Sequence, residues 1–282
     1  MLKTHTSLAI ALMLLGLFTA EAQGLRCSYF FFKKNLTDDS YRAFHDMRLD
    51  VISGKSTFYS ENTFLKDSLN VIAFNKAGQI VNNQAYRKIS QIPSSTRDMT
   101  IADYSSETFT AYYTEGYLLY IGSKNMDLPE WTVSEEIENI GDYSCKKAVG
   151  QYLGRLWTIW YSEEIPVNAG PWLLWGAPGL IVKAFDSEDL IRFELYRLDL
   201  LEDDHRSEFL KDYNSRKKTV SDKLFKGTLK EIETLHTKVL NDYEYFCELN
   251  GLRRMKVTDS SGRDITNEWT YFPLIPDTYW KK

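Results

Sequence analysis

Three side chains near the middle of the chain could do chemistry. Cys145 could act as a nucleophile if a histidine base lay beside it, and Arg155 and Glu164 could bind an anionic or peptide ligand. The sequence brings no histidine to Cys145, so a buried thiol or half of a disulfide is the favoured interpretation. For Arg155 and Glu164 we favour an ion pair or a capping contact at a sheet edge.

The sequence contains none of the short motifs that define common catalytic sites. Gly-x-Ser-x-Gly, His-Glu-x-x-His, Gly-x-Gly-x-x-Gly and the phosphate-binding Gly-x-x-x-x-Gly-Lys are all absent. No Cys-x-x-Cys or paired-histidine spacing occurs, so we expect no metal and no cofactor. A non-enzymatic protein is therefore favoured, and a peptidase-like hydrolase that uses Cys145 or an acidic pair is the alternative.

Tryptophans surround these residues. Trp157 and Trp160 lie in a strand-like segment, and Trp172 and Trp175 enclose two leucines in a loop-like one. Loops are normally polar because they run over the surface. This loop must therefore be packed over a core or line a groove for an apolar ligand, and the buried alternative is favoured because aromatic clusters more often form a core.

Two hairpins would position these side chains. The first has arms at Tyr143 to Gln151 and Leu156 to Ser162, and the second arm is apolar on both faces, which indicates a central, covered strand. The second hairpin has arms at Leu180 to Phe185 and Leu190 to Leu198, the latter with clear alternation.

The rest of the chain divides into strands followed by a helical region. Six further segments, listed at the end of this paragraph, are predicted to be strands. The polar segment Gln91 to Asp103 is predicted to be a loop. Apolar residues three and four apart predict one long helix over Thr219 to Asn250, within a helical insertion at about 202–250. We therefore expect an α+β fold, a curled antiparallel half-open barrel covered by this helix. The predicted strands are Leu25 to Phe32, Tyr41 to Ile52, Ser56 to Tyr59, Thr108 to Tyr113, Tyr117 to Ile121 and Leu252 to Thr258.

An ordered series of short motifs between Ile140 and Ile181 resembles the GLPGLI family, exported proteins of Gram-negative bacteria. The series is Tyr-x-Cys-x-Lys-Ala, Gly-Arg, Trp-Tyr, Ile-Pro, Gly-Pro and Gly-x-Pro-Gly-Leu-Ile, read here from Tyr143 onward. Ala177 departs from the family's leucine. The resemblance implies an exported location and a fold type, and it implies no activity.

Glycines and prolines in this series predict tight turns. Pro178 and Gly179 suit the central positions of a type II turn, in which glycine takes the positive φ. Gly170 and Pro171 are expected to fix the entry to the tryptophan loop, and Gly176 starts the terminal hexapeptide.

The N-terminus has the form of a secretory signal peptide. A polar start, the apolar run Leu8 to Phe18 and the small-x-small pattern before Gln23 predict cleavage near Ala22. The run is shorter than the roughly 20 residues of a spanning helix, and no later segment is long and apolar enough, so we expect no transmembrane segment. Residues 23–282 would form a single domain, periplasmic or secreted.

Three cysteines, Cys27, Cys145 and Cys247, allow one disulfide and one free thiol in an oxidising compartment, and Cys27–Cys247 is a possible pair. The formal net charge is −5 and no basic block occurs, which argues against nucleic acid as the main partner. The expected partners are an apolar small molecule, a lipid or an envelope protein. A structural component of a surface assembly is a further alternative.

The candidate ligand-binding set is therefore Arg155, Trp157, Trp160, Glu164, Trp172 and Trp175.

Overall fold

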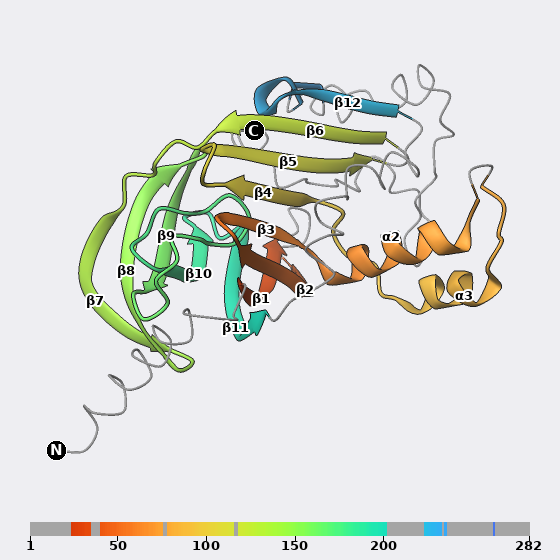
Figure 1. Ribbon diagram of the computed structural model, residues 1–282. Helices are drawn as coiled ribbons and strands as arrows, with labels where there is room; N and C mark the ends of the chain where they lie inside the picture. The colour runs from red at the N-terminus through yellow and green to blue at the C-terminus, as the bar shows by residue number, and fades with distance from the viewer. Residues whose placement is uncertain are drawn as a thin grey trace.

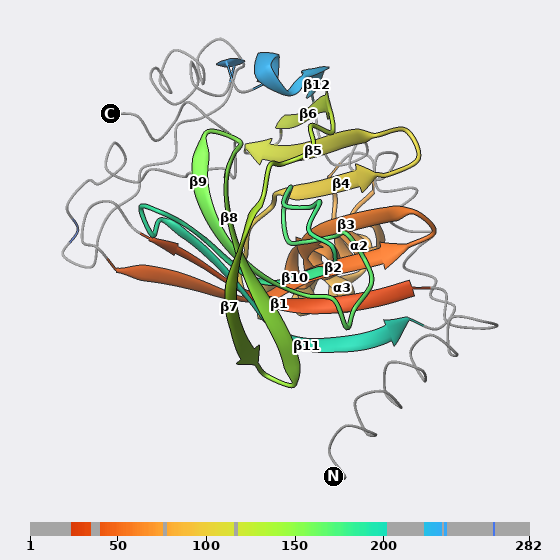
Figure 2. The ribbon, with the colours of Figure 1, turned by 90° about the vertical axis from the view of Figure 1, so that its left-hand side faces the viewer.

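The computed structural model describes residues 24–34, 40–75, 78–115, 118–201, 223–232, 234–235 and 262. All strands of this part belong to one twelve-stranded sheet, with the order β12-β6-β5-β4-β3-β2-β1-β11-β10-β9-β8-β7. The sheet is strongly curled, so that β7–β9 rise beside β4–β6 (Figures 1 and 2). The elements are β1 (Gly24–Lys34), β2 (Tyr41–Ile52), β3 (Lys55–Ser60), α2 (Glu61–Ala73), α3 (Asn83–Gln91), β4 (Met99–Asp103), β5 (Thr108–Glu115), β6 (Leu118–Asn125), β7 (Thr132–Ile140), β8 (Tyr143–Tyr152), β9 (Arg155–Ser162), β10 (Leu180–Asp186), β11 (Ile191–Leu201) and β12 (Lys223–Thr228).

The sheet has a filled inner face and a partly covered outer face. On β3, Phe58 points into the main core, whereas its neighbour Tyr59 packs on Phe64 of α2 with ring centroids 5.6 Å apart. This alternation follows from the two-residue period of a strand. The loop between β9 and β10 lies on the inner side, and α2 and α3 lie on the other (Figure 2).

The predicted hairpins are confirmed. β8 pairs with β9 and β10 with β11, both antiparallel, and their arms lie within one or a few residues of the expected bounds. β2 has the expected bounds, Tyr41–Ile52. In the middle of β9, Trp157 and Ile159 are fully buried on one face and Trp160 is 7% exposed on the other, as a covered central strand requires.

The predicted α+β class with a long covering helix is wrong. The described part is mainly strand, and the sheet is mixed because β12 runs parallel to β6. Lys223–Thr228, expected as helix, instead pairs along β6, where Phe225 stacks on Tyr120 at 5.1 Å. The free edge of β6 offers backbone hydrogen bonds that local helical periodicity does not reveal.

A helix does begin after β12, but it is described only over residues 229–232 and 234–235. Leu229 and Ile232 are buried against Gly122 of β6, so the predicted apolar spacing is correct there. Residues 202–222 and 236–261, and with them the expected strand Leu252 to Thr258, lie outside the described residues.

Two further corrections concern the segment between β3 and β5. The range Gln91 to Asp103, expected as loop, includes β4, which pairs with β3 and β5 and buries Met99 and Ala102. Helices α2 and α3 were not expected. Each begins at a polar cap, since Ser60 Oγ accepts from Thr63 N and Asn82 Oδ1 accepts from Ala85 N.

Candidate functional site

The tryptophan loop, Glu163–Gly179, folds back on the start of β10 and is called the plug loop below. Ala169 and Trp175 form an isolated bridge, and the Ile181 amide donates to the Ala169 carbonyl at 3.0 Å. The Leu180 amide likewise donates to the Ile165 carbonyl at 3.0 Å. A buried loop must satisfy its backbone groups internally, and these bonds do so.

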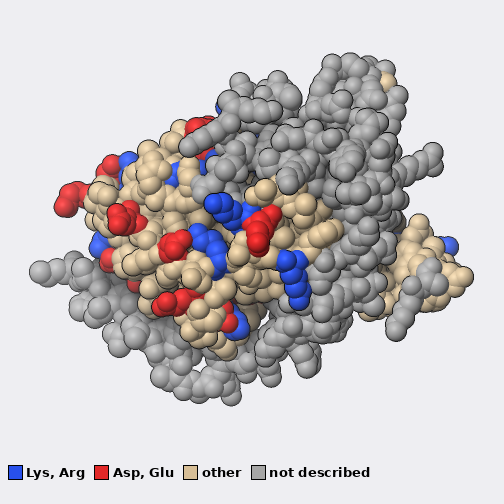
Figure 3. Space-filling model, turned by 90° about the horizontal axis from the view of Figure 1, so that it is seen from above, with Lys and Arg blue, Asp and Glu red and all other residues tan. Residues whose placement is uncertain are grey.

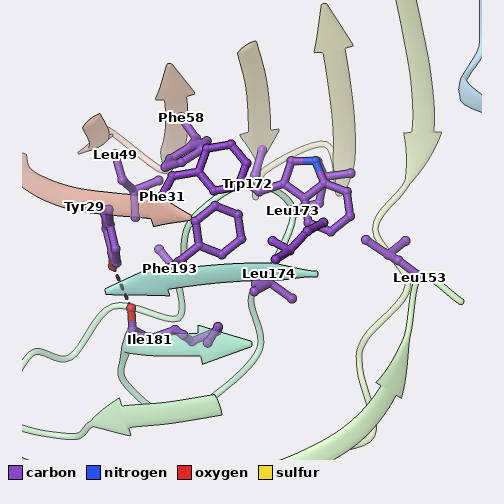
Figure 4. Packing of buried hydrophobic residues seen from close by; sticks show 14 of the residues in the cluster. Tyr29, Phe31, Leu49, Phe58, Leu153, Trp172, Leu173, Leu174, Ile181 and Phe193 are labelled. Atoms are coloured by element: carbon purple, nitrogen blue, oxygen red, sulfur yellow. Dashed lines mark hydrogen bonds between the residues drawn. The ribbon is translucent and has the colours of Figure 1, made fainter. Parts of the chain in front are cut away.

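The plug loop fills the inner face of the curled sheet. Trp172 is 4% exposed, and Leu173 and Leu174 are 0% and 1% exposed. These side chains meet the aromatic rings of β1, β3 and β11 (Figure 4), and the Trp172 ring lies 5.9 Å from that of Trp157. The Thr100 hydroxyl donates to the Trp172 carbonyl at 2.8 Å. The buried interpretation of this loop is confirmed for Trp172.

The structure requires glycine at Gly170, Gly176 and Gly179, but a type II turn at Pro178–Gly179 is not the reason. Gly176 has φ +82°, but Gly179 is not among the residues with positive φ, so that prediction is wrong for Gly179. A Cβ on Gly179 would lie 2.1 Å from the Ser162 carbonyl oxygen, and one on Gly170 would lie 2.8 Å from the Leu174 oxygen. Both positions need glycine because two backbone segments touch there.

Trp175 connects the plug loop to the far end of the β8–β9 hairpin. Its half-buried indole N–H donates to the Asp127 carbonyl and to the Tyr152 hydroxyl, both at 3.2 Å. Its carbonyl accepts from Trp131 Nε1 at 2.9 Å. Burial raises the pKa of Tyr152 well above its ordinary value, so the phenol stays neutral. Trp175 therefore helps to position Tyr152, which lines a neighbouring hollow.

That hollow, called the groove below, has a volume of about 810 Å³ and lies between the β6–β7 connection and the tip of β8–β9. Its lining includes exposed Leu128 (69%) and Leu156 (38%), and also Lys124, which pairs with Asp127 at 2.8 Å. The groove is lined by Lys124, Asp127, Leu128, Pro129, Glu130, Thr132, Val149, Gly150, Gln151, Tyr152, Leu153, Gly154 and Leu156.

Arg155 does not face the groove. It is 7% exposed and forms an ion pair with Asp186, which is 2% exposed. Asp186 Oδ1 also accepts from the Leu190 and Ile191 amides at 2.7 and 3.2 Å, so the pair joins the β8–β9 turn to the β10–β11 turn. An ion pair was the favoured interpretation of Arg155, although the partner is buried Asp186 rather than a sheet-edge group.

The remaining predicted site residues divide into two groups. Trp157, with its indole donating to the Tyr152 carbonyl at 3.0 Å, joins Trp172 and Trp175 in one neighbourhood. Trp160 lies on the opposite face of β9 in a small core with Cys145, and Glu164 is exposed in the turn after β9. The structure therefore brings together three of the tryptophans and leaves Trp160, Arg155 and Glu164 apart.

The described cysteines are buried thiols. Cys27 and Cys145 are both free thiols and 0% exposed. Cys247, the other half of the possible Cys27–Cys247 pair, lies outside the described residues. Burial raises the pKa of Cys145 to about 11 and that of Cys27 further. A thiolate is thus strongly disfavoured at neutral pH, which opposes a nucleophilic role for Cys145.

The residues around the groove were missed in the sequence because their signals are weak. Leu128 and Pro129 lie in a short connection between strands. Leu156 shares a strand face with Trp160, so nothing in the sequence distinguished Leu156 as a groove residue. Gly150 offers the best retrospective signal: a Cβ there would lie 2.7 Å from the Glu130 carbonyl, so the strand must carry glycine where the connection crosses it.

Within the described residues, no group of three or more His, Cys, Asp or Glu side chains is placed to hold a metal ion. The helices of the same residues include none that is long and apolar enough to cross a bilayer.

Comparisons with known proteins give weak structural likeness only. No family model matches the chain, and no curated protein does. A solved structure of PNGF-II aligns with 14% identity over 76% of this chain and 32% of its own, with a TM-score of 0.47. A second crystal form of PNGF-II aligns with a TM-score of 0.46, 13% identity and coverage of 75% and 33%. The chain thus spans about a third of the PNGF-II chain.

A putative outer membrane lipoprotein-sorting protein domain from Vibrio parahaemolyticus aligns with 8% identity over 73% of this chain and 97% of its own, with a TM-score of 0.30. At these scores and identities none of the alignments assigns a function.

Proposed function

We propose that the chain is a non-enzymatic binding protein of the bacterial envelope, a member of the GLPGLI family exported after cleavage near Ala22. It takes an apolar group, from a small molecule, a lipid or an envelope protein, in the groove beside the β8–β9 hairpin. The observation that carries the proposal is the groove itself, about 810 Å³ with exposed leucines in its lining. Ligand sites in proteins commonly have about 300–1,000 Å³.

The filled inner face directs an apolar ligand to the groove. A curled sheet under a cover could hold an apolar molecule inside, but the space in front of β1 and β3 is occupied by Trp172, Leu173 and Leu174 (Figure 4). Interiors are close-packed, so a ligand of any size would have to displace the plug loop. The groove needs no such displacement.

The lining of the groove contains both apolar and charged side chains, which fits an amphipathic ligand. Leu128, Tyr152 and Leu156 provide apolar contact, whereas Lys124, Asp127 and Glu130 provide charge. An apolar group would bury the leucine side chains, and a polar end would face the Lys124–Asp127 pair. The hydrolase alternative receives no support from Cys145, whose thiol is buried and protonated.

The test is a titration with N-phenyl-1-naphthylamine, an apolar dye that fluoresces when it leaves water. We expect saturable binding to the purified protein, weakened by about ten-fold when Leu128 and Leu156 are both changed to Gln. Both side chains are exposed, so folding should be unaffected. The control is Leu200→Gln, at a leucine on β11 that is 39% exposed, close to the 38% of Leu156.

Equal binding by the double variant and the wild type would place the dye elsewhere and reject the groove. Native mass spectrometry of protein isolated from the periplasm is the companion measurement. An apolar molecule that co-purifies with the wild type and is lost from the Leu128/Leu156 variant would identify the natural ligand.

A further inference from the structure

The α2–α3 hairpin carries a concentration of exposed apolar side chains that the groove does not explain. It projects from the outer side of the sheet, away from β7–β9 (Figure 1). The exposed large hydrophobic residues elsewhere in the described part are divided among β2, the β6–β7 connection, β7, β9 and β11. On this hairpin they form one set: Leu65, Val71, Ile72, Ile80, Val81 and Tyr86.

The most exposed members of the set lie where the two helices meet. Ile72 at the end of α2 is 54% exposed, and Ile80 and Val81 before α3 are 44% and 62% exposed. An apolar set gathered on a projecting end, rather than spread over a face, can enter another apolar phase without moving the rest of the protein.

Backbone hydrogen bonds and a ring contact join the described residues of the projecting end. The Val81 and Asn82 amides donate to the Ala73 carbonyl at 2.8 and 3.2 Å, and the Asn75 amide donates to the Gln79 carbonyl at 3.0 Å. Phe74 meets the Tyr86 ring edge-on at 5.8 Å. These contacts hold together the backbone that carries the exposed aliphatic side chains, which reduces the backbone entropy lost on docking.

The charge of this segment is opposite to that of the whole chain. The protein has 39 Asp and Glu among 282 residues and a net charge of −5, yet no acidic residue occurs between Asp67 and Asp98. The charged residues of that interval are Lys76, Arg87, Lys88 and Arg97. In Figure 3 the hairpin, at the right, displays mainly tan atoms with a little blue and no red on the visible face, whereas red and blue groups are mixed on the left.

We propose that the end of the α2–α3 hairpin, with Ile72, Ile80 and Val81 at its tip, inserts into the surface of an anionic lipid bilayer. The aliphatic side chains enter the boundary of the acyl region, and Arg87 and Lys88 contact lipid phosphates. Amphipathic segments with cations beside apolar groups bind membranes in this way. The acidic remainder of the molecule is repelled by the same surface, which orients the hairpin toward it.

A vesicle sedimentation assay tests the proposal. The exported chain is used, with its N-terminus verified by mass spectrometry, because an uncleaved Leu8–Phe18 run would itself bind lipid. We expect binding to vesicles of phosphatidylcholine with about 30 mol% phosphatidylglycerol, weakened about ten-fold by Ile72→Ser with Val81→Ser. The matched control is Ile137→Ser on β7, where the isoleucine is 65% exposed.

The charge contribution is tested separately. Arg87→Gln with Lys88→Gln should weaken binding to the anionic vesicles, and raised salt should weaken the wild type in the same way. Undiminished sedimentation of the Ile72/Val81 variant, or no sedimentation of the wild type, would overturn the proposal. So would analytical ultracentrifugation that finds a dimer which Val81→Ser converts to monomer, because the tip would then bind a second copy of the chain.

Discussion

Gly176 and Gly179 stand three residues apart, yet different physical requirements select them. Gly176 takes a left-handed backbone conformation, with φ +82°. Gly179 is held by a close approach, since any side chain there would meet the backbone of Ser162 and Glu163. The sequence predicted a positive φ at Gly179, and this prediction is wrong because the close approach that requires glycine there depends on β9, a separate strand.

Substitution of Gly179 measures this close approach. We expect Gly179→Ala to lower the free energy of unfolding by about 3 kcal/mol or more, because backbone must move to admit the methyl group. The control is Gly78→Ala, at φ +73° with open space around the site, which should cost only about 1 kcal/mol. Urea unfolding gives both values. A Gly179→Ala variant no less stable than the control would contradict the described backbone contact.

Arg155 illustrates the limit of prediction at the level of a single residue. An ion pair was the natural expectation for an arginine at a turn, but its partner, Asp186, lies at the end of another strand, β10. The pairing depends on how β9 and β10 align in the sheet, with Trp157 opposite Asp186. Such registers follow from the whole sheet rather than from either hairpin.

At the scale of elements, the strands that were predicted carry a strong local signal. β11 was found because its apolar residues alternate, and β9 was found because its aromatic and aliphatic residues occupy both faces. The short strand β4 was missed because Met99–Asp103 offers little alternation and follows a polar segment. For Lys223–Thr228, local helical spacing competed with pairing along the β6 edge, and pairing prevailed.

The plug loop could belong to the core or to a ligand site, and substitution of Trp172 distinguishes the two. Trp172→Ala should lower the free energy of unfolding by about 3–5 kcal/mol, since it leaves a cavity among buried rings. Trp175→Phe keeps ring contacts and removes two hydrogen bonds, so it should cost about 1–2 kcal/mol. Chemical denaturation with near-ultraviolet circular dichroism measures both.

One result for the Trp172 variant would contradict a place for the plug loop in the core. If Trp172→Ala keeps the wild-type unfolding midpoint but no longer binds N-phenyl-1-naphthylamine, the plug loop is a ligand contact and not part of the core.

At the scale of the whole molecule, the groove and the α2–α3 hairpin lie in different places on the sheet. The plug loop fills the inner face of the curled sheet, and the groove lies beside the β8–β9 tip. The α2–α3 hairpin projects on the other side of the sheet (Figures 1 and 2). The sequence indicated a curled sheet and an apolar loop packed over its core. It did not indicate the parallel strand β12 or the projecting hairpin, because both depend on pairings and exposures between distant segments.

The central claim is that the plug loop is a fixed part of the interior. Hydrogen exchange of its backbone amides, followed by mass spectrometry with peptides that cover residues 165–181, tests this most directly. The Leu174, Leu180 and Ile181 amides donate to carbonyls within 3.1 Å, so we predict exchange as slow as that of β9. Exchange of these amides as fast as in the exposed turn at Ser105–Glu107 would contradict the claim.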